Sequence, residues 1–188
     1  MSYDQAKPAP SVPKLEFPGG SPQLPPLRLV PLSMDVLHAL RRNDLEAAAE
    51  ISGVRLTPYF AEHGWLWDIR IAQIARDPTV QEWIARAALD LETVVGHVGF
   101  HGPPDERGMI EVAYSVDPHL RRRGYATRML ASALIWAQGH PGVTTVRATV
   151  APDNAASIAT LAGFPFARVG EQWDDVDGLE FVYEMRLA

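Results

Sequence analysis

Alternation of apolar and polar residues is the clearest pattern along this chain, and it predicts β-strands. In residues 109–116 the two alternating sets are Ile110, Val112, Tyr114 and Val116 against Glu111, Ala113 and Ser115. Further strands are predicted at residues 27–32, 81–89, 93–100, 144–150 and 179–187. Because a period of two is the period of a strand with one buried face, we expect a sheet of six or seven strands.

Helices are predicted between these strands by apolar spacings of three and four residues and by capping signals. The expected helices, the first two capped by Ser33 and Asn43, cover residues 34–42, 44–51, 65–76 and 124–138, with a short one after Asp153. Residues 53–64 carry loop signals, and the turn at 102–108 makes residues 93–116 a hairpin. The fold class expected is a mixed α/β (α+β) sandwich, with helices on both faces of a largely antiparallel sheet.

Proline divides the chain into two unequal parts. Seven of the 16 prolines lie within residues 1–26, where they prevent a regular helix or an interior strand. We therefore expect an extended arm at residues 1–26 and a single domain over residues 27–188. The arm is either a simple leader or a segment that contacts a partner subunit.

Composition excludes several classes of chemistry. The 188 residues contain no cysteine, which removes disulfides, thiolate nucleophiles and cysteine zinc sites, and no His or Asp cluster has metal-ligand spacing. Lys7 and Lys14 are the two lysines, so the domain has none for a Schiff base or a Walker-type phosphate loop. The net charge of −6 argues against nucleic acid as a partner, and no apolar run suits a membrane span or a signal peptide. A cytoplasmic protein is the expectation.

The most informative segment runs from the end of strand 109–116 into the helix that begins near Gly124. From Val116 to Thr127 it reads VDPHLRRRGYAT. The first backbone N–H groups of a helix have no partner within it and lie at the positive end of the helix dipole. Because Gly124 and Ala126 are small, an anion can approach these groups closely. The segment is therefore predicted to bind phosphate, with a solvated basic turn as the alternative.

This segment resembles the main motif of the GNAT superfamily of acyl-CoA-dependent N-acetyltransferases, Gln/Arg-x-x-Gly-x-Gly/Ala. Residues 110–118 are similar to the fourth strand of the branch that includes the ribosomal-protein N-terminal acetyltransferases, and a downstream segment resembles that branch's Asn-x-x-Ser helix and Gly-Phe turn. The resemblance covers about residues 27–187. Its matching positions are Arg121, Gly124, Ala126, Asn154, Ser157, Gly163 and Phe164.

The resemblance implies a GNAT-like fold and acetyl-CoA as cosubstrate, with no metal. The CoA pyrophosphate would lie on the backbone of residues 121–126, and the pantetheine would follow the strand edge near Val116, where neighbouring strands would separate. The acetyl group would pass directly to a primary amine in a ternary complex, without a covalent enzyme intermediate. The cofactor-binding set is then Val116, Arg121, Arg122, Arg123, Gly124, Tyr125, Ala126, Asn154 and Ser157.

Two residues are predicted to take part in catalysis. An amine with a pKa of ~10.4 must lose a proton before it attacks, and Glu111, on the polar face of its strand, is the predicted base, acting through a water. A solvent-facing strand glutamate is the alternative. Ser157 is predicted to contact the leaving sulfur or the pantetheine, with a helix-capping role beside Asn154 as the alternative.

A tyrosine acid often follows the Asn-x-x-Ser serine in this family, and this sequence departs from that pattern. Leu161 stands in the corresponding region, and the segment before Gly163 is about two residues shorter than usual. Tyr114 and Tyr183 are the substitutes that the sequence offers, although both lie on apolar strand faces.

Several further side chains are candidates for the acceptor site. His97 and His101 share one face of their strand, and three aromatic residues lie in the segment that shapes the acceptor site in the family. Acidic residues near the C-terminus would favour a cationic acceptor if they face the site. Ordinary roles in the core, at a sheet edge or in a solvated loop are the alternatives. The aromatic residues are Tyr59, Trp65 and Trp67, and the acids are Glu171, Asp174, Asp175, Asp177 and Glu180.

The sequence therefore predicts an acetyl-CoA-dependent N-acetyltransferase that acts on the primary amine of a small molecule or peptide. A non-catalytic GNAT-fold module that holds acyl-CoA for regulation is the alternative, because the expected tyrosine is absent. A homodimer is left open, and so is the identity of the amine.

Overall fold

Seven strands form one sheet in the computed structural model, which describes residues 25–187. Their order across the sheet is β1-β2-β3-β4-β5-β7-β6, and all neighbours are antiparallel except β4 and β5. The expected mixed, largely antiparallel sheet is confirmed. The strands are β1 (Arg28–Pro31), β2 (Arg86–Asp90), β3 (Thr93–Phe100), β4 (Met109–Val116), β5 (Thr145–Val150), β6 (Ala167–Asp174) and β7 (Gly178–Arg186).

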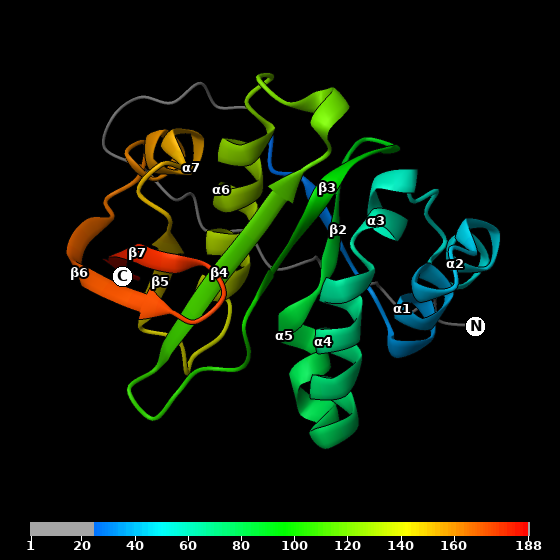
Figure 1. Ribbon diagram of the computed structural model, residues 1–188, viewed down its shortest axis with the longest axis horizontal. Coiled ribbons are helices and arrows are strands. Elements are labelled where there is room, and N and C mark those ends of the chain that lie inside the picture. Colours follow the sequence, from blue (N-terminus) through cyan, green and yellow to red (C-terminus); the bar gives the residue numbers. More distant parts are fainter. Residues whose placement is uncertain (1–24, 188) are drawn as a thin grey trace, which may run out of the picture.

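Helices lie on both faces of this sheet, as expected. The helices are α1 (Met34–Arg41), α2 (Leu45–Ser52), α3 (Pro58–Glu62), α4 (Gly64–Arg76), α5 (Gln81–Ile84), α6 (Tyr125–Gln138) and α7 (Ala155–Leu161). In Figure 1, α1 to α4 gather beside β2 and β3, while α6 and α7 lie beside β4 and β5. Within residues 25–187, no helix combines the length and the apolar character needed to cross a membrane.

Two consecutive residues of β3 show which helices cover each face of the sheet. The ring of His97 lies 5.9 Å from that of Tyr59 in α3 and 5.3 Å from that of Trp67 in α4. Gly96 faces the other way, and a Cβ there would lie 3.0 Å from the Met129 side chain of α6 and 2.2 Å from Ser115 O. A glycine is therefore required where β3 and β4 come this close, and α6 packs directly on the strands.

An opening separates β4 from β5 at one end of the sheet. The two strands pair at three positions, from Met109 with Thr145 to Glu111 with Arg147. Beyond that point β4 continues to Val116 paired with β3, whereas β5 continues to Val150 paired with β7. The strand edges that face each other there have no ladder hydrogen bonds between them, so the expected separation near Val116 is confirmed.

Three predicted elements differ from the structure. Residues 53–64 were expected to be a loop but contain α3, because Pro58 occupies the first position of a helix, where its missing N–H does no harm. The first part of the predicted strand 81–89 is helix α5, which follows a short 3₁₀ turn at Pro78–Val80. The helix expected to be capped by Asn43 is capped by Asp44, whose side chain accepts from Ala47 N.

The C-terminal acids were expected on and beside a loop, and that expectation was partly wrong. Glu171 and Asp174 lie on β6, an edge strand that pairs with β7. Asp174 Oδ1 closes the intervening turn by accepting from the N–H groups of Val176 and Asp177. Because most residues of β6 are exposed, its sequence lacks the alternation that marks a half-buried strand.

The N-terminal arm lies mostly outside the described residues. Pro25 is the first described residue, and its carbonyl accepts two hydrogen bonds from the Arg128 guanidinium. The division into an arm at residues 1–26 and a domain at 27–188 stays a prediction.

Candidate active site

The first turn of α6 presents backbone N–H groups that no side chain caps. Gly124, just before the helix, has φ 78° and ψ 4°, and Arg122 also has a positive φ, of 61°. The N–H of Arg128 donates to Gly124 O at 3.2 Å, so the N–H groups of residues 125–127 precede the regular helical bonds. A left-handed conformation at a residue other than glycine is unfavourable by ~1–2 kcal/mol and is common at binding sites. The local backbone therefore matches the phosphate cradle that the sequence predicts.

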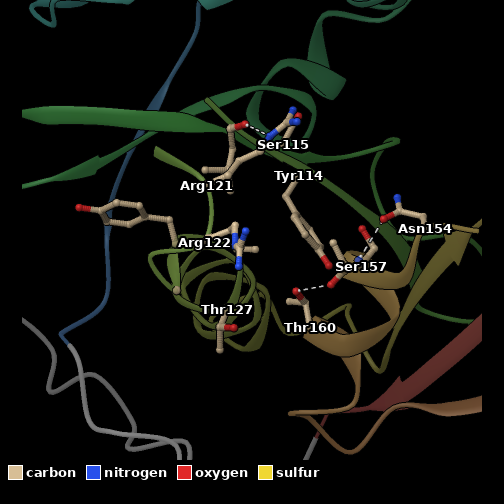
Figure 2. A pocket seen from close by; sticks show the side chains of 13 residues that line it. Tyr114, Ser115, Arg121, Arg122, Thr127, Asn154, Ser157 and Thr160 are labelled. Atoms are coloured by element: carbon tan, nitrogen blue, oxygen red, sulfur yellow. Dashed lines mark hydrogen bonds between the residues drawn. The ribbon is translucent and has the colours of Figure 1, made fainter. Parts of the chain in front are cut away.

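These groups line a cavity of about 490 Å³ between the end of β4, the start of α6 and α7. Figure 2 shows Arg121 and Arg122 on one side of it and Asn154 and Ser157 on the other. Arg121 also donates from Nε to Val116 O at 3.2 Å, which holds its side chain against the end of β4. Arg123, although predicted with the others, is exposed and is not among the lining residues. Eight predicted residues do line the cavity: Val116, Arg121, Arg122, Gly124, Tyr125, Ala126, Asn154 and Ser157.

The start of α7 forms the wall opposite the cradle. Asn154 caps this helix, and its Oδ1 accepts from Ser157 N at 3.1 Å. The cap is therefore the asparagine, and Ser157 is free of that role and lines the cavity. Asn154 and Ser157 both line the cavity in which the Asn-x-x-Ser resemblance predicts that the cofactor binds.

Tyr114 brings a buried hydroxyl to this cavity. It comes from β4 and ends beside Ser157 and Thr160 of α7, as Figure 2 shows. The hydroxyl is buried and makes no hydrogen bond of good geometry within the described residues. Burial raises the pKa of the phenol, although the nearby Ser157 and Thr160 side chains oppose that effect. A neutral O–H donor without a protein acceptor therefore faces the cavity.

Glu111 lies on the opposite face of β4, at the point where β4 and β5 separate. Thr149 of β5 donates from Oγ1 to Glu111 Oε1 at 2.7 Å. His101 Nδ1 lies 3.6 Å from the same oxygen. The Glu111 side chain is 21% exposed, which leaves it open to water. A carboxylate held in this way can accept a proton from a group that reaches the separation between the strands.

His97 of β3 and His101, which directly follows β3, share this face with Glu111. Burial, with smaller contributions from His63 and Arg70, lowers the pKa of His97 to about 3, so this ring is neutral. Burial also lowers the pKa of His101; Glu111 and Glu180 oppose the shift, and Arg70 adds to it. Of the C-terminal acids, Glu180 therefore lies within electrostatic range of the Glu111 site.

The aromatic candidates divide between core and surface. Tyr59 and Trp67 are buried, whereas Trp65 is 65% exposed. The Tyr59 hydroxyl forms a short hydrogen bond with the Ser115 hydroxyl, which ties α3 to β4. Sequence reasoning did not single out Thr149, because a threonine on an alternating strand has the same pattern whether it faces a carboxylate or water.

The family is decided by comparison with known proteins. A model described as the Acetyltransferase (GNAT) family matches residues 45–164, well over half of the chain. The chain belongs to the GNAT acetyltransferase family. The match includes β4, the start of α6 and α7, and so all the residues that line the cavity.

Two curated relatives from Bacillus subtilis (strain 168) match this GNAT chain over part of its length. The uncharacterized N-acetyltransferase YjdG is 36% identical over 73 residues, 39% of this chain and 44% of YjdG. The uncharacterized N-acetyltransferase YoaA is 26% identical over 81 residues, 43% of this chain and 46% of YoaA. The chain thus spans less than half the length of each relative in these alignments.

Solved GNAT structures share the fold at low sequence identity. AAC(6')-Ib in complex with paromomycin and acetyl-CoA has a TM-score of 0.61 at 14% identity, covering 86% of this chain and 94% of that one. RimL, a ribosomal L7/L12 alpha-N-protein acetyltransferase, has a TM-score of 0.61 at 12% identity, covering 88% and 93%. A spermidine N-acetyltransferase chimera from Vibrio cholerae has a TM-score of 0.59 at 15% identity, covering 85% and 95%. At these identities the likeness establishes the fold alone.

Proposed function

We propose that this protein is an acetyl-CoA-dependent N-acetyltransferase that acts on a primary amine. The observation that carries the proposal is the single cavity that joins the uncapped start of α6 to the separated end of β4. A long ligand with an anionic end and a reactive end fits that arrangement. Family membership and the acetyl-CoA named with AAC(6')-Ib support the choice of ligand.

The cradle would hold the diphosphate of CoA. The N–H groups of residues 122–126 would supply donors, since the Arg121 N–H donates to Pro118 O at 3.4 Å, and the side chains of Arg121 and Arg122 border the same space. Glycine at 124 and alanine at 126 leave room for phosphate oxygens beside the backbone. Asn154 and Ser157 would contact the pantetheine where α7 meets the cavity.

An ammonium loses two protons as it becomes an amide, and the leaving thiolate takes one up. The amine nitrogen attacks the thioester carbonyl carbon, the carbon–sulfur bond breaks, and the acetyl group ends on nitrogen. Glu111 would take the proton that the ammonium loses, through a water, while Thr149 holds the carboxylate in place. The thiolate leaves with the electron pair of the carbon–sulfur bond and would take up a proton from Ser157 or Tyr114, two of the hydroxyl groups that line the cavity, and that hydroxyl would regain a proton from the acylated nitrogen.

Turnover distinguishes an enzyme from a module that only binds acyl-CoA. The purified protein is mixed with acetyl-CoA and a panel of primary amines, and thiol release is followed. Amine-dependent release supports the proposal, and calorimetry measures the affinity for acetyl-CoA separately. Affinity without release from any amine would favour the regulatory module, and the absence of both would contradict both functions.

A further inference from the structure

Arg70 of α4 is a buried guanidinium without a countercharge among the described residues. The residue is 6% exposed, and its Nε is buried with no hydrogen-bond partner. Its Nη1 donates to Oε1 of Gln73, a neutral acceptor, at 2.8 Å. Burial lowers the Arg70 pKa to about 10, and no carboxylate offsets that shift. Since a buried charge is strongly unfavourable unless it is paired, a carboxylate that reached this guanidinium would be stabilised by it.

Arg86, which is also buried, and the half-buried Arg128 show what Arg70 lacks. Arg86 donates to Trp83 O at 3.1 Å and its guanidinium lies 3.8 Å from the centre of the Trp136 ring; burial lowers its pKa to about 10, as at Arg70, but Glu82 opposes that shift. Arg128 forms a two-pronged ion pair with Asp90. Arg70 makes no ion pair and no ring contact of this kind within residues 25–187. Of the two buried arginines within residues 25–187, Arg70 is therefore the one with neither an aromatic ring nor a carboxylate beside it.

A chain of side chains leads from Arg70 to Glu111. Gln73, which accepts from Arg70, donates from Nε2 to His101 O at 3.0 Å. His101 Nδ1 in turn lies 3.6 Å from Glu111 Oε1. The charge of Arg70 also lowers the pKa values of His97 and His101. The unpaired cation thus belongs to the face of the sheet where the proposed base lies.

The charges on this face are of both signs. Glu111 of β4 and Glu180 of β7 are the acids near His101, and Arg70 of α4 is the permanent cation. His97 is neutral because of burial, and His63 is its other basic neighbour. An acceptor whose only charged groups were amines could pair with Glu111 and Glu180, but it would leave the Arg70 guanidinium without a countercharge.

We propose that the acceptor is a small molecule with a carboxylate close to its primary amine, as in an α-amino acid, and that Arg70 binds that carboxylate. The inference rests on the proposed acetyltransferase function and narrows its substrate class. A carboxylate would replace the neutral Oε1 of Gln73 as the acceptor of the Arg70 hydrogen bonds, and a charged acceptor makes stronger hydrogen bonds to a guanidinium. The amine of the same molecule would then lie toward Glu111.

The first experiment uses the wild-type protein and needs no variant. Common α-amino acids are compared with their amides and their decarboxylated amines as acceptors of acetyl-CoA. The loss of a charge-assisted hydrogen bond lowers kcat/KM by ~10- to 100-fold, so the amide and the amine should fall behind the parent acid by that factor. Spermidine, which lacks a carboxylate, should be as poor as the decarboxylated amines.

The second experiment changes Arg70. Arg70→Gln should raise the KM for the amino acid by ~10- to 100-fold and leave the KM for the decarboxylated amine nearly unchanged. Arg70→Lys, which keeps the charge, should recover part of the affinity. Arg76→Gln, at an exposed position on the same helix, is the matched control and should change neither value. Calorimetry of the amino acid with the CoA-loaded protein gives a readout that does not depend on turnover.

The outcomes separate this inference from the proposed function. A preference for the acid that is lost in Arg70→Gln supports it. Equal rates for acids, amides and amines would overturn it while leaving the acetyltransferase intact. No acetyl-CoA affinity and no turnover with any amine would overturn the proposed function, and this inference with it.

Discussion

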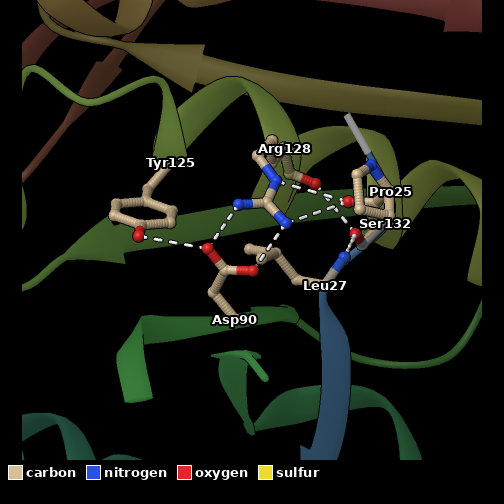
Figure 3. A network of polar contacts seen from close by, with 6 residues as sticks. All are labelled: Pro25, Leu27, Asp90, Tyr125, Arg128 and Ser132. Atoms are coloured by element: carbon tan, nitrogen blue, oxygen red, sulfur yellow. Dashed lines mark hydrogen bonds and ion pairs between the residues drawn. The ribbon is translucent and has the colours of Figure 1, made fainter. Parts of the chain in front are cut away.

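Asp90, at the end of β2, holds Arg128 in the first turns of α6 with both of its carboxylate oxygens. The Nη1–Oδ2 and Nη2–Oδ1 distances are 2.8 and 2.9 Å, and the Tyr125 hydroxyl donates to the same Oδ2 at 3.2 Å (Figure 3). Arg128 also donates to Pro25 O. One carboxylate therefore ties the start of α6 to the sheet, and the arginine that it holds also anchors the segment just before β1.

Removing the charge of Asp90 should loosen the start of α6. The Arg128 hydrogen bonds are the largest of the effects that lower the pKa of Asp90, so the ionised form is the one that the fold stabilises. We expect Asp90→Asn to lower the melting temperature and to weaken acetyl-CoA binding severalfold. Glu92→Gln is the control, because its partner Arg28 lies 3.9 Å away and the Glu92 side chain is 92% exposed. Equal calorimetric affinities for the two variants would argue against a role for Asp90 in positioning the cradle.

A β-branched residue at position 124 should abolish acetyl-CoA binding. Gly124 has φ 78°, a conformation that valine strongly disfavours, and it lies in the proposed diphosphate cradle. Gly53, which ends α2, is a matched control: its φ is 70°, and neither glycine has an atom within 4 Å of the position of an added Cβ. Gly53→Val and Gly124→Val should therefore lose comparable stability in urea titrations. Only Gly124→Val should lose the calorimetric signal with acetyl-CoA, and the same loss in Gly53→Val would contradict the cradle.

The junction between β4 and α6 was predictable because its signals are local. The alternation of residues 109–116, the small residues at 124 and 126 and the apolar stripe of the following helix all lie within 30 consecutive positions. The opening between β4 and β5 was expected from the resemblance, since which strands pair depends on contacts distant in sequence. The structure supplies its position at Glu111 and Arg147.

Features that depend on tertiary surroundings were not predictable. Strand β6 has exposed residues on both faces, so alternation does not mark it. The isolation of Arg70 became visible only once α4 was placed against the sheet, because the sequence places Asp68 two residues away and gives no sign that it pairs with Arg41 instead. Burial of the Tyr114 hydroxyl likewise depends on where α7 lies.

Replacing Glu111 by glutamine should lower kcat with little change in acetyl-CoA affinity. The amide keeps the shape of the side chain and its position beside Thr149 but cannot take the proton of the ammonium. General bases typically contribute ~10²- to 10⁴-fold, so kcat should fall within that range. Glu106→Gln, in the exposed turn before β4, is the control for a lost surface charge. Unchanged turnover in Glu111→Gln would remove Glu111 from the mechanism.

His97 should make the fold sensitive to acid. Its pKa is about 3 in the folded protein, mainly because of burial, against 6.5 as its ordinary value. Between these values the unfolded chain binds the proton and the folded one does not, so stability falls as the pH drops from 6.5 toward 3. At 1.36 kcal/mol per pH unit, the upper bound is about 2 kcal/mol of stability lost between pH 6.5 and pH 5. Urea unfolding at pH 7 and pH 5 measures this loss of stability, and His97→Gln should reduce it. An equal loss in the wild-type protein and the variant would show that groups other than His97 cause the acid sensitivity.

Replacing Tyr114 by phenylalanine tests whether its hydroxyl group is catalytic or structural. Its O–H is buried and makes no hydrogen bond of good geometry within residues 25–187, although Ser157 and Thr160 lie close to it, so Tyr114→Phe should change stability little. If the phenol gives its proton to the leaving thiolate, the same variant should lower kcat without changing acetyl-CoA affinity. The effect should shrink when the acetyl donor carries a better leaving group, because a less basic thiolate needs no proton. Ser157→Ala is the companion variant, since its hydroxyl lines the same cavity. If kcat falls in Ser157→Ala but not in Tyr114→Phe, then Ser157 contacts the leaving sulfur, and Tyr114 lines the cavity without taking part in the reaction.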